Sequence, residues 1–425
     1  MLPAFDQNPV AAPGPGPARP EARVVALVAK LGQALHAYGS SAHRLEDALD
    51  LVSRRLGARG EFFSTPTAIF AAIGEPGGDA DGRPPHTLLL RVEPGEVNLE
   101  KLAGLDAVLG QISRGELAVA AASERIDQIV AAEPRYGRLL TFLAFALASG
   151  GAARFFGGGP REFAAAAAIG LVTGLLAWVA EKLPNAGRLY ETMAALVAAM
   201  LASAACAYFP PMAFPIITLA SLIVLVPGLT LTLAMTELAT RNLVSGAARL
   251  AGALLMFMTM GVGFALGSRV GEAAWGAPAA FVPPAQPFWS EAAALAVTAG
   301  ALLVLFRAHP RDYGYFLFAA TLALFGSRAG ATLLGPQLGA LIGAAAIGMT
   351  SNLLARLRDR PSLITQMPGL MLLVPGSLGF RSVAAMVEQN TLAGVQTAFT
   401  VVLVAISLVT GLLLANVLAP PRRIL

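Results

Sequence analysis

A short turn that occurs twice is the feature of this sequence best suited to chemistry on a small solute. The tetrapeptide Leu-Val-Pro-Gly occupies residues 225–228 and recurs at 373–376, inside two long apolar segments. Proline removes a backbone donor and glycine loosens a helix, so peptide groups beside each turn lose their helical partners. In a membrane such groups must be satisfied by protein or line a wet cavity. The pair predicts two broken helices that form a binding site, although two kinks that only help packing would leave the same pattern.

Hydroxyl, amide and cationic side chains lie near these turns in the sequence. They could bind a zwitterion or a carboxylate while free peptide groups meet its charges, although a single Ser or Thr often bonds back to its own helix. Arg328, inside another apolar segment, could hold a substrate carboxylate or pair with a helix C-terminus. The predicted substrate-binding residues are Pro227, Gly228, Thr230, Thr218, Ser221, Pro375, Gly376, Ser377, Gln366 and Arg328.

Two carboxylates beside the apolar segments could carry a proton. Glu237 lies just past the first Pro-Gly segment, and Glu388 follows the second. A charge inside a membrane is costly and by default suggests a functional role. The sequence therefore predicts Glu237 and Glu388 as proton-coupling residues, with an interfacial position for both as the alternative.

Long apolar stretches dominate the chain after residue 135. Hydrophobic residues make up 56% of the 425 and charged residues only 13%, and the charge is denser in residues 1–135. A helix that crosses a bilayer needs roughly 17–25 mostly apolar residues. Ten stretches of about that length are expected near 138–157, 162–182, 190–209, 212–235, 244–268, 288–306, 314–333, 335–356, 362–382 and 393–418.

The basic residues favour one orientation of these ten spans. If the N-terminal part is cytoplasmic, the outer connections carry Arg154, Arg161, Arg269 and Arg381. The cytoplasmic connections and the C-terminal end then carry Lys182, Arg188, Arg241, Arg249, Arg307, Arg311, Arg356, Arg358, Arg360, Arg422 and Arg423. Because Lys and Arg accumulate on the cytoplasmic side of membrane proteins, both termini are expected in the cytoplasm.

The offset of 148 residues between the two turns also relates matching residues in three predicted helices. Matched pairs, all 148 residues apart, are Gly246 with Gly394, Gly263 with Gly411 and Ser203 with Ser351. Two membrane halves, 136–270 and 288–418, of five helices each would have opposite orientations. Inverted repeats with a site at their interface recur among secondary transporters. The predicted fold is a polytopic α-helical membrane protein of about ten transmembrane helices, as two five-helix inverted repeats preceded by a small α+β soluble domain.

Residues 23–135 predict that soluble domain. Helices are expected at 23–38, at 98–113 and at 116–132, and a further helix is expected to follow a cap at Ser40 or Ser41. An extended run is expected at 59–74, interrupted by Pro66, with a partner strand at 86–92. Residues 1–22 are rich in Pro and Gly and predict a disordered tail with no signal peptide. The domain is therefore expected to be cytoplasmic.

The residue patterns argue against an enzyme. His43 and Glu46 could share a metal from one helix face, but no third ligand follows, and a solvated face is the expected interpretation. The sequence contains no Ser-His-Asp pattern and no phosphate loop, so neither a cofactor nor a metal is expected. The single cysteine, Cys206, excludes an intramolecular disulfide. The net charge of +4 comes without runs of Lys or Arg, so nucleic acid is not an expected partner.

Four segments resemble one known family. They are Leu-His-Ala-Tyr-Gly-Ser-Ser-Ala-His-Arg-Leu-Glu at 35–46, Phe-Phe-Ser-Thr-Pro-Thr-Ala-Ile-Phe at 62–70, Arg-Val-Glu-Pro-Gly-Glu-Val-Asn-Leu-Glu-Lys-Leu at 91–102, and the turn at 225–228. Together they resemble the threonine/serine exporter (ThrE) family in its single-chain form, with an N-terminal cytoplasmic domain fused to both membrane halves. The resemblance covers nearly the whole chain.

The resemblance implies export of L-threonine and L-serine from the cytoplasm across a bacterial inner membrane, driven by protons. Export of a dicarboxylate such as succinate is an alternative, favoured if Arg328 and Arg381 face one cavity. A membrane-anchored hydrolase or a solute sensor that uses the N-terminal domain is an alternative of another class. The expected partners are a small amino acid, protons and the lipid bilayer. Gly- and Ala-rich helix faces also allow packing between the protomers of a homo-oligomer.

Overall fold

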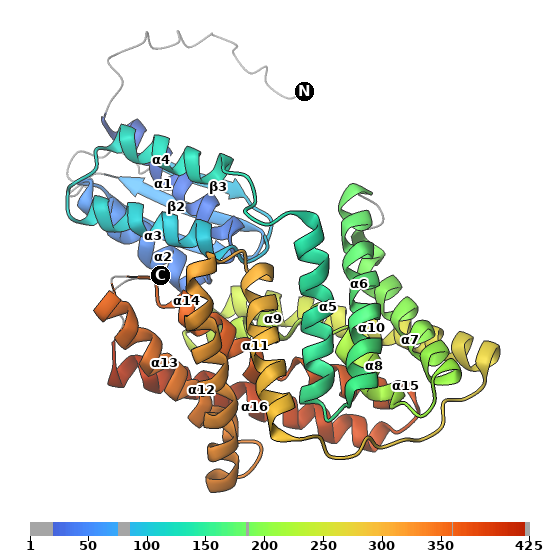
Figure 1. The fold of residues 1–425 in the computed structure, drawn as a ribbon. Helices are drawn as coiled ribbons and strands as arrows, with labels where there is room; N and C mark the ends of the chain where they lie inside the picture. Colours follow the sequence, from blue (N-terminus) through green and yellow to red (C-terminus); the bar gives the residue numbers. More distant parts are fainter. Residues whose placement is uncertain (1–19, 75–85, 184–186, 359, 421–425) are drawn as a thin grey trace, which may run out of the picture.

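The computed structural model describes residues 20–74, 86–183, 187–358 and 360–420. A small domain with a sheet sits at one end of a large helical region (Figure 1). The predicted tail at 1–22 lies almost wholly outside the described residues. The predicted domain boundaries at residues 22, 135, 270 and 288 stay predictions.

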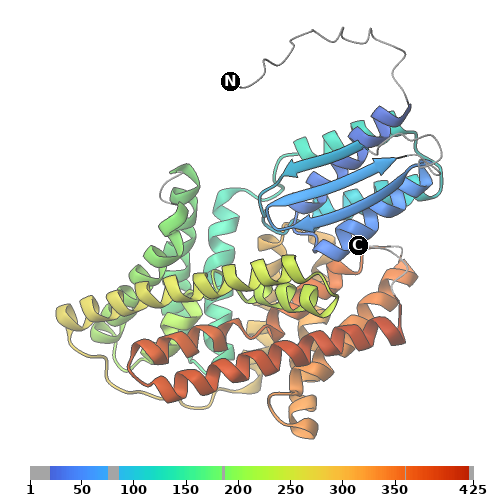
Figure 2. The same cartoon turned by 180° about the vertical axis from the view of Figure 1, so that it is seen from behind.

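The N-terminal domain packs four helices on one face of an antiparallel sheet of strand order β1-β2-β3. Ile69 and Ile73 of the central strand are buried, whereas Phe70 between them is exposed. Figure 2 shows the uncovered face of the sheet. The elements are α1 (Pro20–Ala37), α2 (Ala42–Arg55), β1 (Arg59–Thr65), β2 (Ala68–Gly74), β3 (His86–Arg91), α3 (Leu99–Ser113) and α4 (Val119–Ala131).

Two details of this domain differ from the sequence prediction. The run at 59–74 is a hairpin, because Pro66 and Thr67 form a turn in which Thr65 pairs with Ala68. Ser41 occupies the N-cap position of α2, but its side chain makes no cap hydrogen bond. The predicted helix at 98–113 is confirmed as α3, and Asn98 caps it, since its side chain accepts a hydrogen bond from the Lys101 amide at 3.0 Å.

The helical region contains eight helices that are long and apolar enough to cross a membrane, counted over the described residues. The sequence prediction of ten also includes the segments that hold α5 and the α8–α9 pair. The helices are α5 (Arg138–Phe155), α6 (Pro160–Lys182), α7 (Tyr190–Tyr208), α8 (Phe214–Ser221), α9 (Gly228–Ala239), α10 (Leu243–Trp275), α11 (Phe288–Leu305), α12 (Tyr313–Leu334), α13 (Gly339–Arg358), α14 (Leu363–Leu373), α15 (Gly376–Val387) and α16 (Thr391–Leu418), with short 3-10 turns at Gly187–Leu189 and Pro310–Asp312.

Both predicted helix breaks are present. α8 ends before the first turn and α9 starts at Gly228, whereas α14 ends at Leu373 and α15 starts at Gly376. Pro227 and Pro375 stand at the N-cap positions of α9 and α15. Proline has no N–H to donate, so it fits the start of a helix and not its interior.

Equivalent helices of the two halves pack in the same way. α7 packs along α10 as α13 packs along α16, and α9 contacts α10 as α15 contacts α16. Gly246 faces Ala234 and Leu238, and the residues 148 positions later repeat this contact, since Gly394 faces Ser382 and Met386. The long helices α10 and α16 both run across the view of Figure 2, whereas α5 and α6 run down it.

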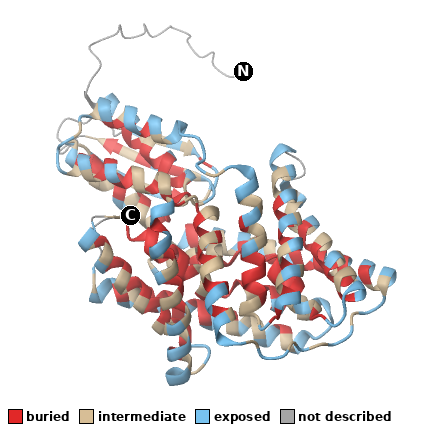
Figure 3. Cartoon of the chain, in the orientation of Figure 1, coloured by how far each residue is buried: buried red, intermediate tan, exposed pale blue. Residues whose placement is uncertain are grey.

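Buried residues lie where the helices face one another and between the N-terminal sheet and its helices (Figure 3). One continuous apolar cluster joins the N-terminal domain to the helical region. It extends from Leu45 and Leu102 to Phe306 of the α11–α12 connection and Met367 of α14. The Leu99 amide also donates to the Phe306 carbonyl at 3.0 Å. The N-terminal domain is therefore docked on the ends of α11 and α14.

Candidate functional site at the crossing of two broken helices

The two Val-Pro-Gly turns touch each other. A Cβ added at Gly228 would lie 3.2 Å from the Gly376 Cα and against the Val374 side chain. A Cβ added at Gly376 would lie 2.9 Å from the Gly228 Cα and 2.6 Å from Val226 Cγ1. Only glycine allows this approach of two backbones, which explains why both turns end in glycine.

Two helix starts meet at this crossing. The first helical hydrogen bond of α9 runs from the Leu231 amide to the Pro227 carbonyl, and that of α15 runs from the Gly379 amide to the Pro375 carbonyl. The amides of the first turn of each helix, including Thr230 of α9, precede these bonds and have no partner within their own helix. A helix start also carries a partial positive charge, so the crossing is suited to an anionic group.

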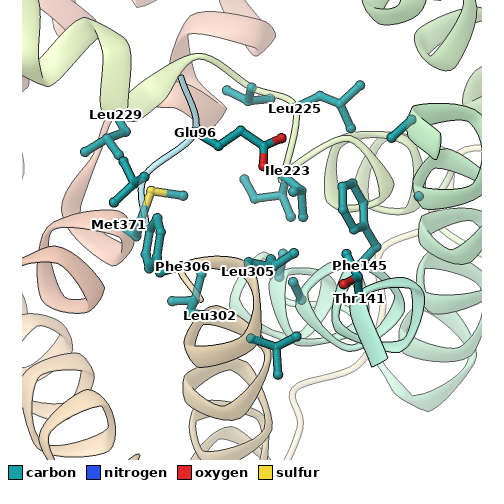
Figure 4. A pocket seen from close by; sticks show the side chains of 18 of the residues that line it. Glu96, Thr141, Phe145, Ile223, Leu225, Leu229, Leu302, Leu305, Phe306 and Met371 are labelled. Carbon is teal, nitrogen blue, oxygen red and sulfur yellow. The ribbon is translucent and has the colours of Figure 1, made fainter. Parts of the chain in front are cut away.

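A cavity of about 1140 Å³ reaches from the crossing to the N-terminal domain. Figure 4 shows its walls: Phe145 of α5, Ile223 and Leu225 before the first turn, Leu302 and Leu305 of α11, and Met371 of α14. Most of these side chains are apolar, as is usual for small-molecule sites. A few polar groups must then determine what binds.

The polar groups of the cavity fall into two sets. Hydroxyls line its helical walls, from Thr230 of α9, Ser377 of α15 and Thr298 of α11. Of these three side chains, Thr298 has its hydroxyl buried against Gly151, where an added Cβ would lie 2.0 Å from its Oγ1, and the hydroxyl has no hydrogen-bond partner in the described part of the chain. Charged side chains line the end of the cavity next to the N-terminal domain, most of them at helix ends and one, Glu96, on a loop of that domain. They are Glu96, Arg138, Glu181, Glu191 and Arg307, with Arg307 Nη2 2.7 Å from Glu96 Oε2.

The cavity brings together some of the predicted binding residues. Pro227, Thr230 and Ser377 line it, and Gly228 and Gly376 form the crossing beside them. Pro375 lies in the second turn, between the lining residues Val374 and Ser377.

Thr218 and Ser221 are buried in α8 and bond within it. The Thr218 hydroxyl donates to the Phe214 carbonyl at 2.9 Å, and the Ser221 hydroxyl donates to the Thr218 carbonyl at 2.9 Å. This back-bonding is the alternative that the sequence had left open for hydroxyls near the turns.

Two other predicted binding residues have protein partners away from the cavity. The Gln366 carbonyl oxygen accepts from Arg44 Nη2 of the N-terminal domain at 3.1 Å. Arg328 of α12 forms an ion pair with Glu291 of α11, with Nη1 3.1 Å from Oε2. Neither residue lines the cavity as the described residues define it.

The two predicted proton carriers occupy different surroundings. Glu237 is fully buried, and its Oε1 accepts from the Ala42 amide at 3.0 Å and from Arg249 Nε at 3.1 Å. Glu388 follows the last residue of α15 and is exposed. Glu237 therefore lies at the contact with the N-terminal domain, and the proton-coupling role stays a prediction for both residues.

Most residues of the cavity wall were not predicted from the sequence. Phe145, Trp178, Thr298 and Leu302 belong to α5, α6 and α11, and as single apolar or hydroxyl residues in apolar helices they carried no signal. The loop at residues 94–97 also lines the cavity. That loop is part of the segment 91–102, which the family resemblance had pointed out without a role.

Glu46, one of the two residues considered for a metal, bonds within the N-terminal domain. Glu46 Oε1 accepts from the Ser64 amide at 2.7 Å. Burial, and then the charge of Arg44, lower the pKa of His43 to about 4, so its imidazole is neutral at pH 7. Among the described residues, no group of three or more His, Cys, Asp or Glu side chains could hold a metal ion.

The apolar helices and the crossed broken pair define a multi-pass membrane protein of the transporter class. The ThrE family model, described as "Putative threonine/serine exporter", matches residues 26–271, and the ThrE_2 model, described as "Threonine/Serine exporter, ThrE", matches residues 291–418. Since the first match alone covers more than half of the sequence, the chain belongs to the threonine/serine exporter family. This confirms the resemblance seen in the sequence.

Relatives of two kinds are similar to the chain. A protein of Corynebacterium glutamicum named "Threonine/serine exporter" is 26% identical over 441 aligned residues, which cover 97% of this chain and 88% of the relative. Proteins named "Pheromone-regulated membrane protein 10" are 30% identical over 248 residues in Kluyveromyces lactis and 26% identical over 389 residues in Yarrowia lipolytica. These matches cover 57% and 87% of this chain but only 25% and 31% of the yeast proteins. No solved structure matches the chain significantly.

Proposed function

We propose that this chain is a secondary-active exporter of small amino acids, L-threonine and L-serine, coupled to protons. The observation that carries the proposal is the meeting of two Val-Pro-Gly turns at one cavity, in a member of a family of exporters. The full-length similarity to the Corynebacterium exporter supports the same solutes.

A small zwitterion suits the groups at the crossing. The starts of α9 and α15 can hold an α-carboxylate, and the carbonyl end of α14, which directly precedes the second turn, can hold an α-ammonium. The hydroxyls of Thr230 and Ser377 can bond the side-chain hydroxyl that threonine and serine share. The apolar remainder of the wall leaves few partners for a larger polar solute.

The proposed topology has ten spans in two inverted halves, with both termini in the cytoplasm of a bacterial cell. Adding α5 and the α8–α9 pair to the eight longer spans gives the ten. Contacts place Arg249 and Arg307 at the N-terminal domain, whereas Arg154 and Arg161 lie at the opposite helix ends, bonded to Ser290 and Pro210. This distribution supports a cytoplasmic N-terminal domain, and alternating access between the halves would move solute outward.

Proton coupling is proposed for Glu237 and Glu388. Glu237 ends the half-helix that starts at the crossing, so a change in its protonation can act on the wall of the cavity. Measuring threonine flux driven by a pH gradient, with Glu237→Gln and Glu388→Gln compared with the parent, tests this step.

The dicarboxylate alternative would be favoured by Arg328 and Arg381 in one cavity. Arg328 is paired with Glu291, and Arg381 lies 5.3 Å from the ring centre of Phe156. Neither arginine is among the described residues that line the cavity. Two other arginines, Arg138 and Arg307, do line the cavity, but Arg307 is already paired with Glu96. Because two carboxylates need two cationic partners, the site favours an amino acid with one carboxylate.

Counterflow in proteoliposomes tests the function. Vesicles loaded with unlabelled L-threonine should take up radiolabelled L-threonine, with competition by L-serine and no competition by succinate. Thr230→Val and Ser377→Ala should reduce this uptake, and Thr218→Val, whose hydroxyl bonds its own helix, is the matched control. Succinate counterflow without threonine counterflow would overturn the solute and leave the fold unaffected.

A further inference from the structure

The first turn of α2 contacts both broken helices at once. We infer that Ala42, His43 and Arg44, which we call the α2 brace, hold α9 and α14 in the arrangement that opens the cavity toward the N-terminal domain. Arg44, Glu237 and Gln366 are then positioning residues that set how often the cavity opens to each side. This inference rests on the proposed transport function and adds a control on access.

The contact with α9 is a helix cap supplied from outside the domain. α2 has no side-chain cap of its own and no acidic residue in its first turn. The carboxylate of Glu237 accepts the Ala42 amide at 3.0 Å instead, so α9 supplies the negative charge that the start of a helix favours. Arg249 of α10, with its Nε 3.0 Å from Glu237 Oε2, neutralises the buried carboxylate. Moving α9 away from α2 would leave the Ala42 amide without its acceptor, while the Glu237 carboxylate would keep Arg249 and lose one of its two donors.

The contact with α14 is a single polar bond from a largely enclosed arginine. Arg44 Nη2 donates to the Gln366 side chain at 3.1 Å, while Nη1 is buried and makes no hydrogen bond within the described part of the chain. Burial lowers the pKa of Arg44 to about 10, with Asp106 and then Asp47 opposing that shift, so the guanidinium is charged at pH 7. An enclosed cation with a spare donor has a strong preference for the Gln366 oxygen over an apolar surface.

The brace is itself fixed to the domain and to α10. The Ser64 amide donates to Glu46 of α2, and the Ser64 carbonyl accepts from Ser245 of α10 at 3.0 Å. On the other side, Gly39, with φ +88°, brings the chain against Val97, where an added Cβ would lie 2.9 Å from Val97 Cγ2. Val97 lines the cavity. The brace is therefore joined to the loop that borders the cavity.

The positions of α9 and α14 explain why this contact matters for access. In the first half the segment on the side of the N-terminal domain is α9, which follows its turn; in the second half it is α14, which precedes its turn. Closing the cavity on this side requires α9 and α14 to move relative to each other or to α2. Figure 1 shows the N-terminal domain resting above both helices. A brace that bonds both helices opposes that movement.

The test measures access directly, without transport. In a Cys206→Ser background, Thr230→Cys places a single thiol in the cavity, and a membrane-impermeant maleimide is added to either side of oriented vesicles. Gln366→Ala, which loosens the brace, should lower the labelling rate from the side of the N-terminal domain by about threefold or more and raise it from the other side. Gln366→Glu, which gives Arg44 a charged acceptor, should change both rates in the opposite directions.

A purely structural role predicts a different result. If the contact only stabilised the fold, both substitutions would change labelling in the same direction or leave it unchanged, and that result would overturn the inference. Arg44→Ala should act like Gln366→Ala, and Arg44→Lys should restore part of the parent behaviour. Thr236→Val, one residue from Glu237 and bonded only to the Thr232 carbonyl, is the matched control on α9 and should leave labelling unchanged.

Substitution of Glu237 gives an independent test of the brace. Glu237→Ala removes the cap of α2 but leaves Arg249 without its partner, so the Glu237→Ala/Arg249→Ala double variant should be compared with it. Both should shift access as Gln366→Ala does, and parent-like labelling in the folded double variant would contradict the brace. If the wild type shows no threonine counterflow but the shifts in labelling occur, the proposed solute fails and the brace stands.

Discussion

The two broken helices share a turn but differ in what the N-terminal domain holds. Both turns read Leu-Val-Pro-Gly, and their glycines face each other. In the first half the domain contacts the segment after the turn, through the buried ion pair of Glu237 and Arg249. In the second half it contacts the segment before the turn, through the neutral Gln366 amide. The backbone of the crossing is symmetric, whereas the side chains that anchor it are not.

The turn residues and the anchoring residues are therefore under different constraints. The turn must keep its sequence in both halves, because two backbones that approach so closely leave no room for a side chain. The anchoring residues can differ, because a single domain on one side of the molecule meets opposite ends of the two broken helices. Each anchoring contact then needs only side chains whose charge and hydrogen bonding suit the degree of burial at that place.

Substitution at the crossing should have the largest effect. Gly228→Val and Gly376→Val each place carbon atoms against the facing turn, so we expect threonine counterflow to fall roughly 10- to 100-fold or to vanish. Both variants should be equally damaged if the turns are equivalent. Gly252→Ala in α10, where a Cβ meets no described atom within 4 Å outside its own helix turn, is the control and should keep full activity. Normal flux in either valine variant would contradict the equivalence of the two turns.

The two anchors should differ in their effect on stability. Glu237→Ala leaves Arg249 partly buried without a partner and should cost about 3 kcal/mol, whereas Gln366→Ala removes a neutral acceptor and should cost about 1 kcal/mol. Cys206 is buried and is the single cysteine, so its reaction with a thiol dye on heating reports unfolding. Equal losses of melting temperature in the two variants would contradict the distinction between the anchors.

Acid should weaken the brace through His43. Because burial holds its pKa at about 4 against an ordinary 6.5, the folded chain favours neutral imidazole. That stability is fully present above pH 6.5 and is lost as pH falls toward 4, by about 2 kcal/mol once partial exposure is allowed for. His43→Gln should flatten the melting temperature between pH 6.5 and 4.5, while His86→Gln on the exposed β3 should not. Parallel curves for the parent and His43→Gln would contradict this.

Loss of one hydroxyl in the cavity should have the smallest effect. Thr230→Val and Ser377→Ala each remove a donor and an acceptor and should raise the KM for threonine about fivefold, near 1 kcal/mol. Thr218→Val should leave KM unchanged, since that hydroxyl serves the Phe214 carbonyl. An unchanged KM in both cavity variants would show that the hydroxyls do not contact the solute.

The sequence predicted the features that depend on local chemistry. The helix breaks followed from Pro-Gly inside apolar segments, and the helix predicted at 98–113 lies at Leu99–Ser113 in the structure. Features that depend on distant residues were missed. Nothing near Ser41 in the sequence shows that Glu237, almost two hundred positions away, supplies the acceptor for α2. The partners of Gln366 and Arg328 likewise come from other helices, so these two residues were assigned to the solute.

Direct protection of the cavity by solute is the measurement that tests the central claim. With Thr230→Cys in the Cys206→Ser background, the maleimide labelling rate should fall as L-threonine or L-serine is added, and it should be insensitive to succinate. The concentration that halves the rate should match the KM of counterflow for the same variant. Labelling unaffected by saturating threonine, in a variant that still transports it, would show that the solute does not pass where the two turns meet.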